Sequence, residues 1–257
     1  MKQKIYKSTQ LTILHIIFFI IGYFMIACSL AFALPKGFVY LKDIDPTIIE
    51  NLRYYSNENF MGRKIDGYKS GKVILTKQAA EAISNVQKVL LKDGYSLVIY
   101  DAYRPQRAVD SFVQWGADID DQGEKEKYYP AINKADVFEL GYVAAKSSHT
   151  RGSTVDLTII KTNDSLKAIE IKKRQLKDEN WIPFLDDGTV DMGSSFDLFG
   201  EASYHDSNLI GSQFLIMRNY LRETMKKYGF NEYKEEWWHY TLKDEPFPDT
   251  YFDFEIN

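Results

Sequence analysis

Residues 147–160 of the 257-residue chain read SSHTRGSTVDLTII, and residues 235–239 read EEWWH. The aliphatic and β-branched end of the first stretch, residues 155–160, predicts a buried strand. The second stretch lies within the aromatic-rich residues 233–242, which predict the last strand of the chain. Each stretch holds a histidine and a carboxylate, so the two strands are expected to bring reactive side chains to one sheet.

The histidines and carboxylates of these stretches match the needs of a hydrolytic zinc site. Catalytic zinc takes three protein ligands, usually histidine or carboxylate, and leaves a fourth position for water. His149, Asp156 and His239 supply such a set. Bound zinc lowers the pKa of a water towards about 7, so that the water becomes a nucleophile at neutral pH. Glu236 is the candidate general base that accepts the proton.

The spacing of Glu236 and His239 sets a geometric condition on the last strand. Residues three apart in a regular strand point to opposite faces of the sheet. Both side chains can serve one metal only if the strand is distorted between them. We therefore predict a bulge within residues 236–239, a feature that is common beside active sites.

Periodicity predicts the elements on either side of these strands. Residues 76–92 carry apolar side chains at three- and four-residue steps, which predicts an amphipathic helix capped by Thr76. Further helices are expected over residues 105–116 and 208–228, the latter ended by Gly229, and a buried strand over residues 96–100. Residues 40–54 are expected to form a strand or short helix at the start of the domain. Residues 118–135 are polar and predict a loop. Residues 161–179 are charged and predict a segment that extends over the surface.

Helices and strands are mixed in this order without strict alternation, which favours the α+β class. The expected architecture is a single domain with a central, mainly antiparallel sheet flanked by helices, and with the zinc site on the sheet. Aromatic side chains are expected to dominate the core, because the chain contains 18 Tyr, 16 Phe and 4 Trp.

The charge of the chain excludes one class of partner. The formal net charge is -4 and no basic run occurs outside the first residues, so no nucleic-acid partner is expected. The single cysteine is Cys28, so residues 34–257 contain no disulfide and depend on their core for stability.

The first 33 residues predict a secretory signal peptide. Lys2, Lys4 and Lys7 precede a long apolar stretch over residues 11–30, and Ala-Phe-Ala at residues 31–33 forms a small-x-small cleavage signature. The protein is then exported, to the periplasm or the outside of the cell, as a domain of residues 34–257. Because the apolar stretch is long, an uncleaved membrane anchor is the alternative, and lipidation of Cys28 is a third reading. In each case only this segment contacts a membrane.

Several segments together resemble the D-alanyl-D-alanine dipeptidases of the VanX type. That family is grouped with lysostaphin-like peptidases and the hedgehog amino domain. SSHTRGSTVD at residues 147–156 and EWWH at residues 236–239 carry the metal motifs of the group. DAYRP at residues 101–105 and MGSSFD at residues 192–197 match further family segments, and LRY at residues 52–54 does so more loosely. The resemblance spans nearly all of residues 40–254.

The resemblance implies a role for each matching residue. It implies one zinc per chain on His149, Asp156 and His239, with Glu236 as the base that later returns the proton. Arg104 is implied to stabilise the oxyanion, which suits a permanent cation placed in a loop after a strand. Asp197 and Tyr54 are implied to hold the ammonium group of a small D-amino-acid dipeptide, with Ser147 a hydrogen-bonding partner in the same pocket.

Two other functions remain open from the sequence. Peptidoglycan carboxypeptidases or endopeptidases share the metal motifs and act on stem peptides through an open groove. A zinc-binding recognition module without turnover is the second alternative, although such a module has no need of Glu236 and Arg104.

Three further residues are interpreted structurally. His205 matches no motif and is interpreted as a structural histidine, whereas Trp237 and Trp238 are expected in the core and the pocket wall. The sequence does not determine the oligomeric state.

Overall fold

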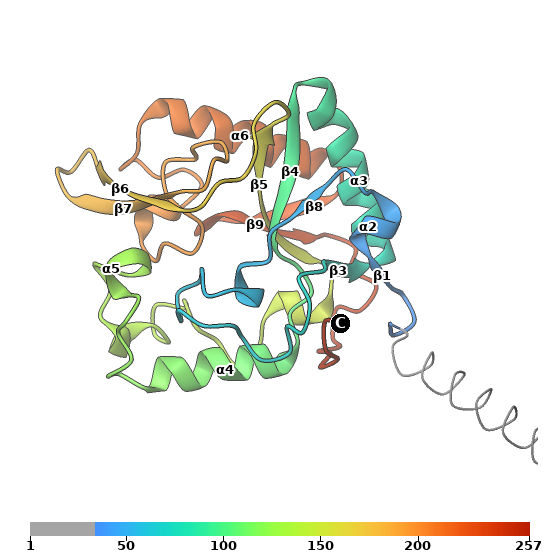
Figure 1. Ribbon diagram of the computed structural model, residues 1–257, viewed down its shortest axis with the longest axis horizontal. Helices are drawn as coiled ribbons and strands as arrows, with labels where there is room; N and C mark the ends of the chain where they lie inside the picture. The colour runs from blue at the N-terminus through green and yellow to red at the C-terminus, as the bar shows by residue number, and fades with distance from the viewer. Residues whose placement is uncertain (1–33) are drawn as a thin grey trace, which may run out of the picture. The chain divides into compact units, whose positions relative to one another are not determined.

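The central feature of the computed structural model is a five-stranded sheet with the order β2-β4-β5-β9-β8 (Figure 1). The model describes residues 34–257, of which residues 37–257 form one compact unit; the predicted signal or anchor lies outside the described residues. The strands are β2 (Ile49–Glu50), β4 (Tyr95–Asp101), β5 (Thr154–Lys161), β8 (Phe230–Tyr233) and β9 (Glu236–Leu242). Only the β2–β4 pair of this sheet is parallel, so the predicted mainly antiparallel α+β fold is confirmed.

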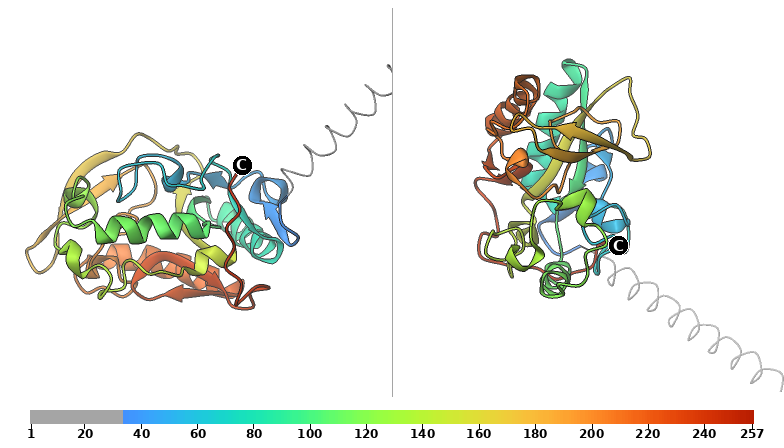
Figure 2. Two further views of the ribbon diagram at one scale, coloured as in Figure 1. Left: turned by 90° about the horizontal axis from the view of Figure 1, so that it is seen from below. Right: turned by 90° about the vertical axis from the view of Figure 1, so that its left-hand side faces the viewer.

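Three longer helices surround the sheet. They are α3 (Lys77–Lys92), α4 (Gln106–Ala117) and α6 (Ser212–Lys227). α3 packs against β4 and α6 against β8, whereas α4 lies below the sheet in Figure 1 and crosses in front of it in the view from below (Figure 2). With cover on both faces, β4 and β5 are buried along almost their whole length, which explains their continuous apolar sequences.

The ends of the helices follow from local chemistry. The hydroxyl of Thr76 accepts the Ala79 N–H at 3.4 Å, so the predicted cap of α3 is confirmed. α6 begins at Ser212, later than the predicted residue 208, because the side chain of Ser207 accepts the Leu209 N–H and holds this stretch as a turn.

The segment before α3 contains both kinds of element predicted for it. β1 (Phe38–Tyr40) pairs with β3 (Ile74–Thr76) in a separate small sheet, and α2 (Leu41–Ile44) and the 3-10 turn η1 (Arg53–Tyr55) complete the segment. The predicted loop after α4 is mostly irregular, but it includes the short α5 (Lys125–Tyr128) and η2 (Lys134–Asp136).

The charged segment of residues 161–179 is mostly exposed, as predicted, and it also contains a strand that the sequence did not indicate. Part of it is strand β6 (Glu170–Gln175), which pairs in antiparallel register with β7 (Trp181–Asp186) to form a hairpin. Most side chains of β6 are exposed, so the strand lacks the apolar alternation that would have marked it in the sequence.

Two further 3-10 turns, η3 (Ser148–Arg151) and η4 (Glu201–Ser203), complete the elements. Within residues 34–257, no helix combines the length and apolar character needed to cross a membrane. Aromatic rings fill the space between the sheet and α4, as expected from composition. Phe60 contacts Phe112, Trp115 and Phe199 with ring centroids 4.8–5.4 Å apart.

Candidate active site

Strand register places three polar residues in a row across the sheet. Asp156 on β5 lies opposite His239 on β9 and opposite Asp101 on β4. Directly paired residues share one face of an antiparallel sheet. A register shift between Ile99 and Asp101 is what aligns Asp101 with Asp156. The row faces the side of the sheet on which α4 lies, and two of its members belong to the predicted metal site.

β9 is distorted where the sequence predicts it. Glu232 pairs with Tyr240, but the next residue of β8, Tyr233, pairs with Glu236, so residues 237–239 have no counterpart in the β8 register. The predicted bulge is confirmed. Glu236 Oε2 consequently lies 3.4 Å from His239 Nδ1, which a regular strand would not allow.

His149 comes from the turn η3 rather than from the sheet. The Ser147 hydroxyl accepts the His149 N–H at 3.3 Å and caps the turn, and Ser147 also lines the cavity as predicted. Gly152 ends the turn with a φ of +83°, a left-handed conformation that favours glycine. A Cβ at this position would lie 2.2 Å from the Phe38 ring, so a side chain has no space there.

The three predicted metal ligands converge. One ligand atom from each of His149, Asp156 and His239 lies within 4.8 Å of the others. Asp156 Oδ2 is 3.2 Å from His149 Nε2, Asp156 Oδ1 is 3.1 Å from His239 Nδ1, and the two imidazole nitrogens are 3.3 Å apart. Two histidines and one carboxylate form a donor set that suits zinc.

Hydrogen bonds behind the histidines fix which nitrogen faces the centre. His149 Nδ1 lies 2.7 Å from the carbonyl oxygen of Ala102, which can only accept, so Nδ1 carries the proton and Nε2 presents its lone pair. His239 Nε2 lies 3.3 Å from the Ser148 hydroxyl on its outer side. Such outer partners orient metal-binding histidines. Asp156 Oδ1 is buried and lies 3.1 Å from His239 Nδ1, so a metal ion bound here would replace a proton shared by these two atoms.

The electrostatics of the cluster favour a cation. Burial alone raises the pKa of Asp156, but the neighbouring imidazoles outweigh burial and bring the pKa well below its usual range. Burial lowers the pKa of His239, yet hydrogen bonds to Asp156 and Glu236 raise it to about 9. The cluster therefore attracts a proton or a metal ion, and metal binding would release that proton.

Arg104 lies beside the ligand set and is firmly held. Its Nε donates to Asp101 Oδ2 at 2.8 Å, and its Nη2 lies 3.5 Å from Asp156 Oδ2. The guanidinium carbon is 4.9 Å from the Tyr54 ring centroid and 5.1 Å from that of Phe112. One carboxylate and two aromatic faces thus hold the cation against the cavity.

Asp197 and Tyr54 form the predicted pair. The Tyr54 hydroxyl donates to Asp197 Oδ2 at 2.9 Å, and both residues are buried. Burial and the nearby Asp156 carboxylate raise the pKa of Asp197 well above its usual range. A cation bound next to Asp197 would favour its charged form, so the carboxyl group is set to receive a positively charged ligand.

All eight predicted site residues border one cavity of about 420 Å³. Its walls include Phe112 from α4, Phe199, and Tyr142 and Lys146 from the segment before η3. Residues 141–144 and 146–148 thus form part of the cavity wall. Trp237 and Trp238 are buried, and the Trp237 indole donates to Ser194 Oγ at 3.0 Å, which confirms the predicted core role. Neither tryptophan borders the cavity, so their predicted place in the pocket wall is wrong.

Sequence reasoning missed two residues of the site. Asp101 is fully buried and accepts the Tyr68 hydroxyl at 2.6 Å as well as the Arg104 guanidinium. The sequence feature that could have identified Asp101 is an ionisable residue at the end of a buried strand, three positions before an arginine. Ser148 gave no signal beyond lying next to His149. His205 does not line the cavity; it is buried elsewhere against Tyr240, with ring centroids 5.7 Å apart.

Comparison with known proteins gives concordant matches. The family described as "D-ala-D-ala dipeptidase" (Peptidase_M15) matches residues 35–171 and 184–257. A D-alanyl-D-alanine dipeptidase of Enterococcus faecalis is 39% identical over 225 residues, which cover 87% of this chain and 100% of the relative. Proteins of the same name from Enterococcus faecium and Streptomyces coelicolor are 38% and 37% identical, over 86% and 85% of this chain and 98% of each relative.

Proposed function

The chain belongs to the D-Ala-D-Ala dipeptidase family, Peptidase_M15, a family of metallopeptidases, and from this premise we propose that it hydrolyses free D-alanyl-D-alanine. One observation carries the proposal beyond the family. The cavity that is lined by a zinc-type ligand set is also lined by Asp197, a buried carboxyl group that would bind a substrate ammonium group. A dipeptide with free ends needs both.

One zinc would be held by His149, Asp156 and His239. The donor set, the inward lone pair of His149 Nε2 and the buried oxygen Oδ1 of Asp156 all fit a cation at this point. Bound zinc would polarise the scissile carbonyl and lower the pKa of the attacking water.

Glu236 and Arg104 divide the remaining chemistry. Glu236 is half-buried at the edge of the ligand set, so its carboxylate can accept the proton of the attacking water and deliver it to the leaving amine. The Arg104 guanidinium, held by Asp101 at the cavity, would stabilise the negative charge that develops on the former carbonyl oxygen. Because that charge arises only after attack, Arg104 contributes to kcat more than to binding.

Asp197 and Tyr54 would recognise the amino end of the substrate. A buried carboxylate forms a strong charge-assisted hydrogen bond with an ammonium group. The Tyr54 hydroxyl fixes the orientation of that carboxylate. The pair would close the cavity at the amino end, which supports a dipeptidase over enzymes that act on peptidoglycan stem peptides. Glu236 and Arg104 beside the ligand set argue against a recognition module without turnover.

A substrate panel tests the proposal. The zinc-loaded full chain is incubated with D-Ala-D-Ala, L-Ala-L-Ala and a pentapeptide ending in D-Ala-D-Ala, and released alanine is measured. We expect efficient hydrolysis of the free D,D-dipeptide, much slower hydrolysis of D,D-peptides whose amino end is blocked or extended, and no hydrolysis of L-Ala-L-Ala. Efficient cleavage of the pentapeptide would favour the peptidoglycan alternative.

The metal ligands are tested separately. His149→Ala and His239→Ala proteins should lose zinc, and full zinc content in both would refute the ligand set.

We also propose that the enzyme acts outside the inner membrane. The support is the sequence of residues 1–33, with its lysines, apolar stretch and Ala-Phe-Ala signature. Mass spectrometry of the natural protein should find a chain that begins near Leu34 in an exported fraction. An intact Met1 in the cytosol would refute export, and an intact Met1 in the membrane fraction would favour the anchor.

A further inference from the structure

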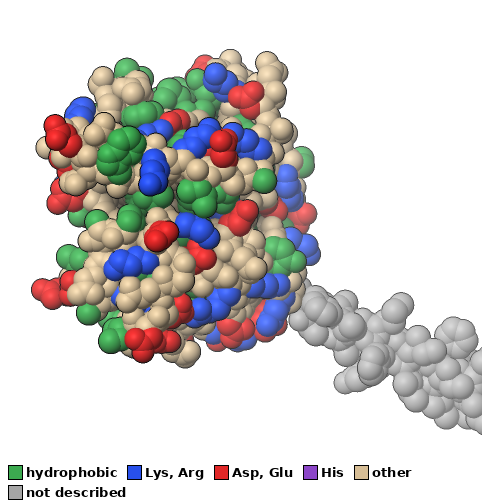
Figure 3. Space-filling view, turned by 60° about the vertical axis from the view of Figure 1, so that its left-hand side comes forward, with side chains coloured by type: hydrophobic (Ala, Val, Ile, Leu, Met, Phe, Trp, Pro, Cys, Tyr) green, Lys and Arg blue, Asp and Glu red, His purple; other side chains and the backbone are tan. Residues whose placement is uncertain are grey.

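The β6–β7 hairpin is the part of the fold that the family match omits. The match stops at residue 171 and resumes at residue 184, so the turn, most of β6 and half of β7 lie outside it. The hairpin projects from the body next to α5 (Figure 1), on a face where hydrophobic side chains are exposed beside lysines and arginines (Figure 3). Ile171 and Trp181 are 56% and 58% exposed. The outer surface of the hairpin therefore makes few packing contacts with the rest of the protein.

One edge of the hairpin is bonded to the segment that carries Asp197. The backbone N–H of Leu185 on β7 donates to Ser195 Oγ at 2.7 Å. Ser195 is buried and lies two residues before Asp197. This side-chain bond attaches the hairpin to the amino-terminal side of Asp197.

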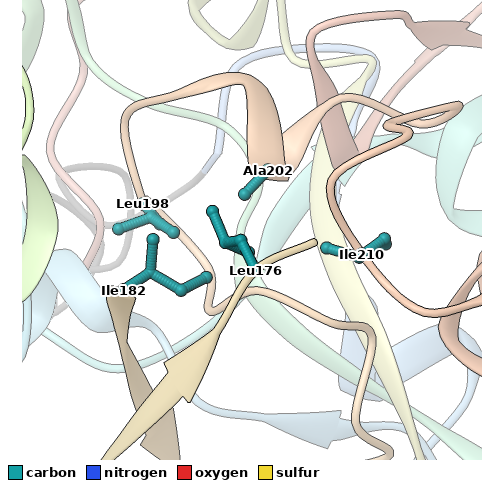
Figure 4. Packing of buried hydrophobic residues seen from close by; sticks show 5 residues of the cluster. All are labelled: Leu176, Ile182, Leu198, Ala202 and Ile210. Atoms are coloured by element: carbon teal, nitrogen blue, oxygen red, sulfur yellow. The ribbon is translucent and has the colours of Figure 1, made fainter. Parts of the chain in front are cut away.

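The inner face of the hairpin packs on the other side of the same residue. Leu176 and Ile182 form a buried hydrophobic cluster with Leu198, the residue that follows Asp197 (Figure 4). Ala202 and Ile210 complete the cluster. Asp197 is therefore flanked by a hydrogen bond to the hairpin on one side and by apolar contact with the hairpin on the other.

A third contact holds the hairpin to the body. Arg174 on β6 forms a bidentate salt bridge with Asp191, in which Nη1 lies 2.8 Å from Oδ1. Its guanidinium carbon lies 4.1 Å from the Phe184 ring centroid and 4.4 Å from that of Phe214 on α6. Because Phe184 belongs to the hairpin itself, the salt bridge to Asp191 and the contact with Phe214 are what restrict its movement relative to the body.

The backbone of Asp197 needs such support. Its φ is +59°, in the left-handed region that residues other than glycine rarely adopt. A residue holds a conformation of this kind only where the surrounding structure imposes it. Among the described residues, only Glu179, in the hairpin turn, and Asp197 are non-glycine residues with positive φ.

We propose that the β6–β7 hairpin is a positioning element that holds Asp197 in its left-handed conformation and thereby sets the preference for substrates with a free amino terminus. The inference rests on the proposed role of Asp197 as the partner of the substrate ammonium group. It assigns a specificity function to a segment that lies mostly outside the family match.

Two variants of the full chain test the hairpin contacts separately. Ser195→Ala removes the acceptor of the Leu185 N–H, and Ile182→Ala removes apolar contact with Leu198. kcat and KM are measured for D-Ala-D-Ala and for N-acetyl-D-Ala-D-Ala, with zinc content determined for each protein. We expect KM for the free dipeptide to rise roughly tenfold in each variant, because a small displacement of a binding group is costly.

The acetylated dipeptide separates positioning from general damage. It has no ammonium group for Asp197, so its kcat/KM should stay within about twofold of wild type, as should kcat for the free dipeptide and zinc content. Ile171→Ala, an exposed change on the same hairpin, is the matched control and should alter neither substrate. A parallel loss of kcat/KM for both substrates in the two test variants would mean a structural role and overturn the proposal.

Asp197→Asn distinguishes failure of this inference from failure of the proposed function. We expect it to lose the preference for the free dipeptide to a larger extent than the hairpin variants. If Asp197→Asn loses the preference and both hairpin variants keep it, the hairpin inference is wrong and the role of Asp197 stands. If Asp197→Asn itself keeps the preference, the amine-binding role is wrong and the hairpin inference falls with it.

Discussion

Asp156 contacts more of the site than any other single carboxylate. It lies within 3.5 Å of both predicted histidine ligands and of Arg104, and it is almost fully buried. A buried carboxylate is stable only when its charge is compensated, so the proposed zinc ligands and the arginine proposed to stabilise the oxyanion are coupled through one residue. Effects of substitutions within this group are therefore not expected to be additive.

Glu236 allows binding and chemistry to be separated at a single residue. Glu236→Ala should retain zinc, because Glu236 is not one of the three converging ligands. Its kcat should fall by about 10²–10⁴-fold, since no carboxylate then accepts the proton of the attacking water. Metal analysis and steady-state kinetics on one preparation check both halves. Wild-type turnover in Glu236→Ala would rule out the assigned base, and loss of zinc would make Glu236 a ligand.

Asp101 provides a test of how Arg104 is oriented. Asp101→Asn removes the charge that holds the Arg104 guanidinium, so kcat for D-Ala-D-Ala should fall by roughly 10–100-fold, with little change in KM. Tyr68→Phe is the matched control, because it removes only the hydroxyl bond to Asp101 and leaves the charge. Its effect should be smaller. An equal loss in both variants would indicate that packing around Asp101, rather than its charge, supports the site.

At the scale of elements, the site depends on two departures from regular structure. The distortion of β9 turns Glu236 toward His239, and the register shift in β4 aligns Asp101 with Asp156. The turn η3 adds His149 from outside the sheet. Irregular backbone at these three places brings groups to one face that regular strands would separate.

Gly152 tests the turn that delivers His149. Gly152→Ala places a methyl group 2.2 Å from the Phe38 ring at a φ of +83°. Gly94→Ala is the matched control, because Gly94 has a φ of +82° and no atom within 4 Å of the added carbon. Gly94→Ala should cost about 1 kcal/mol of unfolding free energy from backbone conformation alone. Gly152→Ala should cost about 1–3 kcal/mol more, from overpacking.

Urea unfolding of the two glycine variants measures the difference, and zinc titration of each follows it. Only Gly152→Ala should also weaken zinc binding, because His149 precedes Gly152 in the same turn. Equal destabilisation of both proteins would show that Phe38 yields to the methyl group.

At the scale of the whole molecule, the buried His205 links folding to pH. Burial and the nearby Arg222 and Arg218 lower its pKa from 6.5 to about 4. Between these two values the unfolded chain binds a proton that the folded chain does not, so the free energy of unfolding falls as the pH falls. The contribution of this one residue is at most about 1.4 kcal/mol per pH unit.

His205→Gln should reduce that acid sensitivity. The variant loses stability at pH 7 through imperfect packing, but its unfolding free energy should decline less steeply between pH 6.5 and 4 than that of the wild type. Urea unfolding of both zinc-loaded proteins across this range measures the two slopes, and other titrating groups contribute equally to each. Parallel slopes would mean that folding does not lower the pKa of His205.

Much of the site could be predicted from the sequence because its signals are local. Residue type and spacing identified the ligand set at His149, Asp156 and His239, and three-residue spacing alone predicted the distortion before His239. Periodicity and capping located α3. Apolar runs located β4 and β5, because a strand that is buried on both faces needs an apolar residue at almost every position.

Tertiary structure alone decided what depends on register and on distant contacts. The bulge around Tyr100 sets Asp101 opposite Asp156, and a shift of one residue would have turned it to the other face. The Tyr54–Asp197 bond joins residues 143 positions apart, and the hairpin that flanks Asp197 has an exposed, charged strand without periodicity. Such features arise from the free energy of packing the whole chain. No single stretch of sequence therefore carries a signal for them.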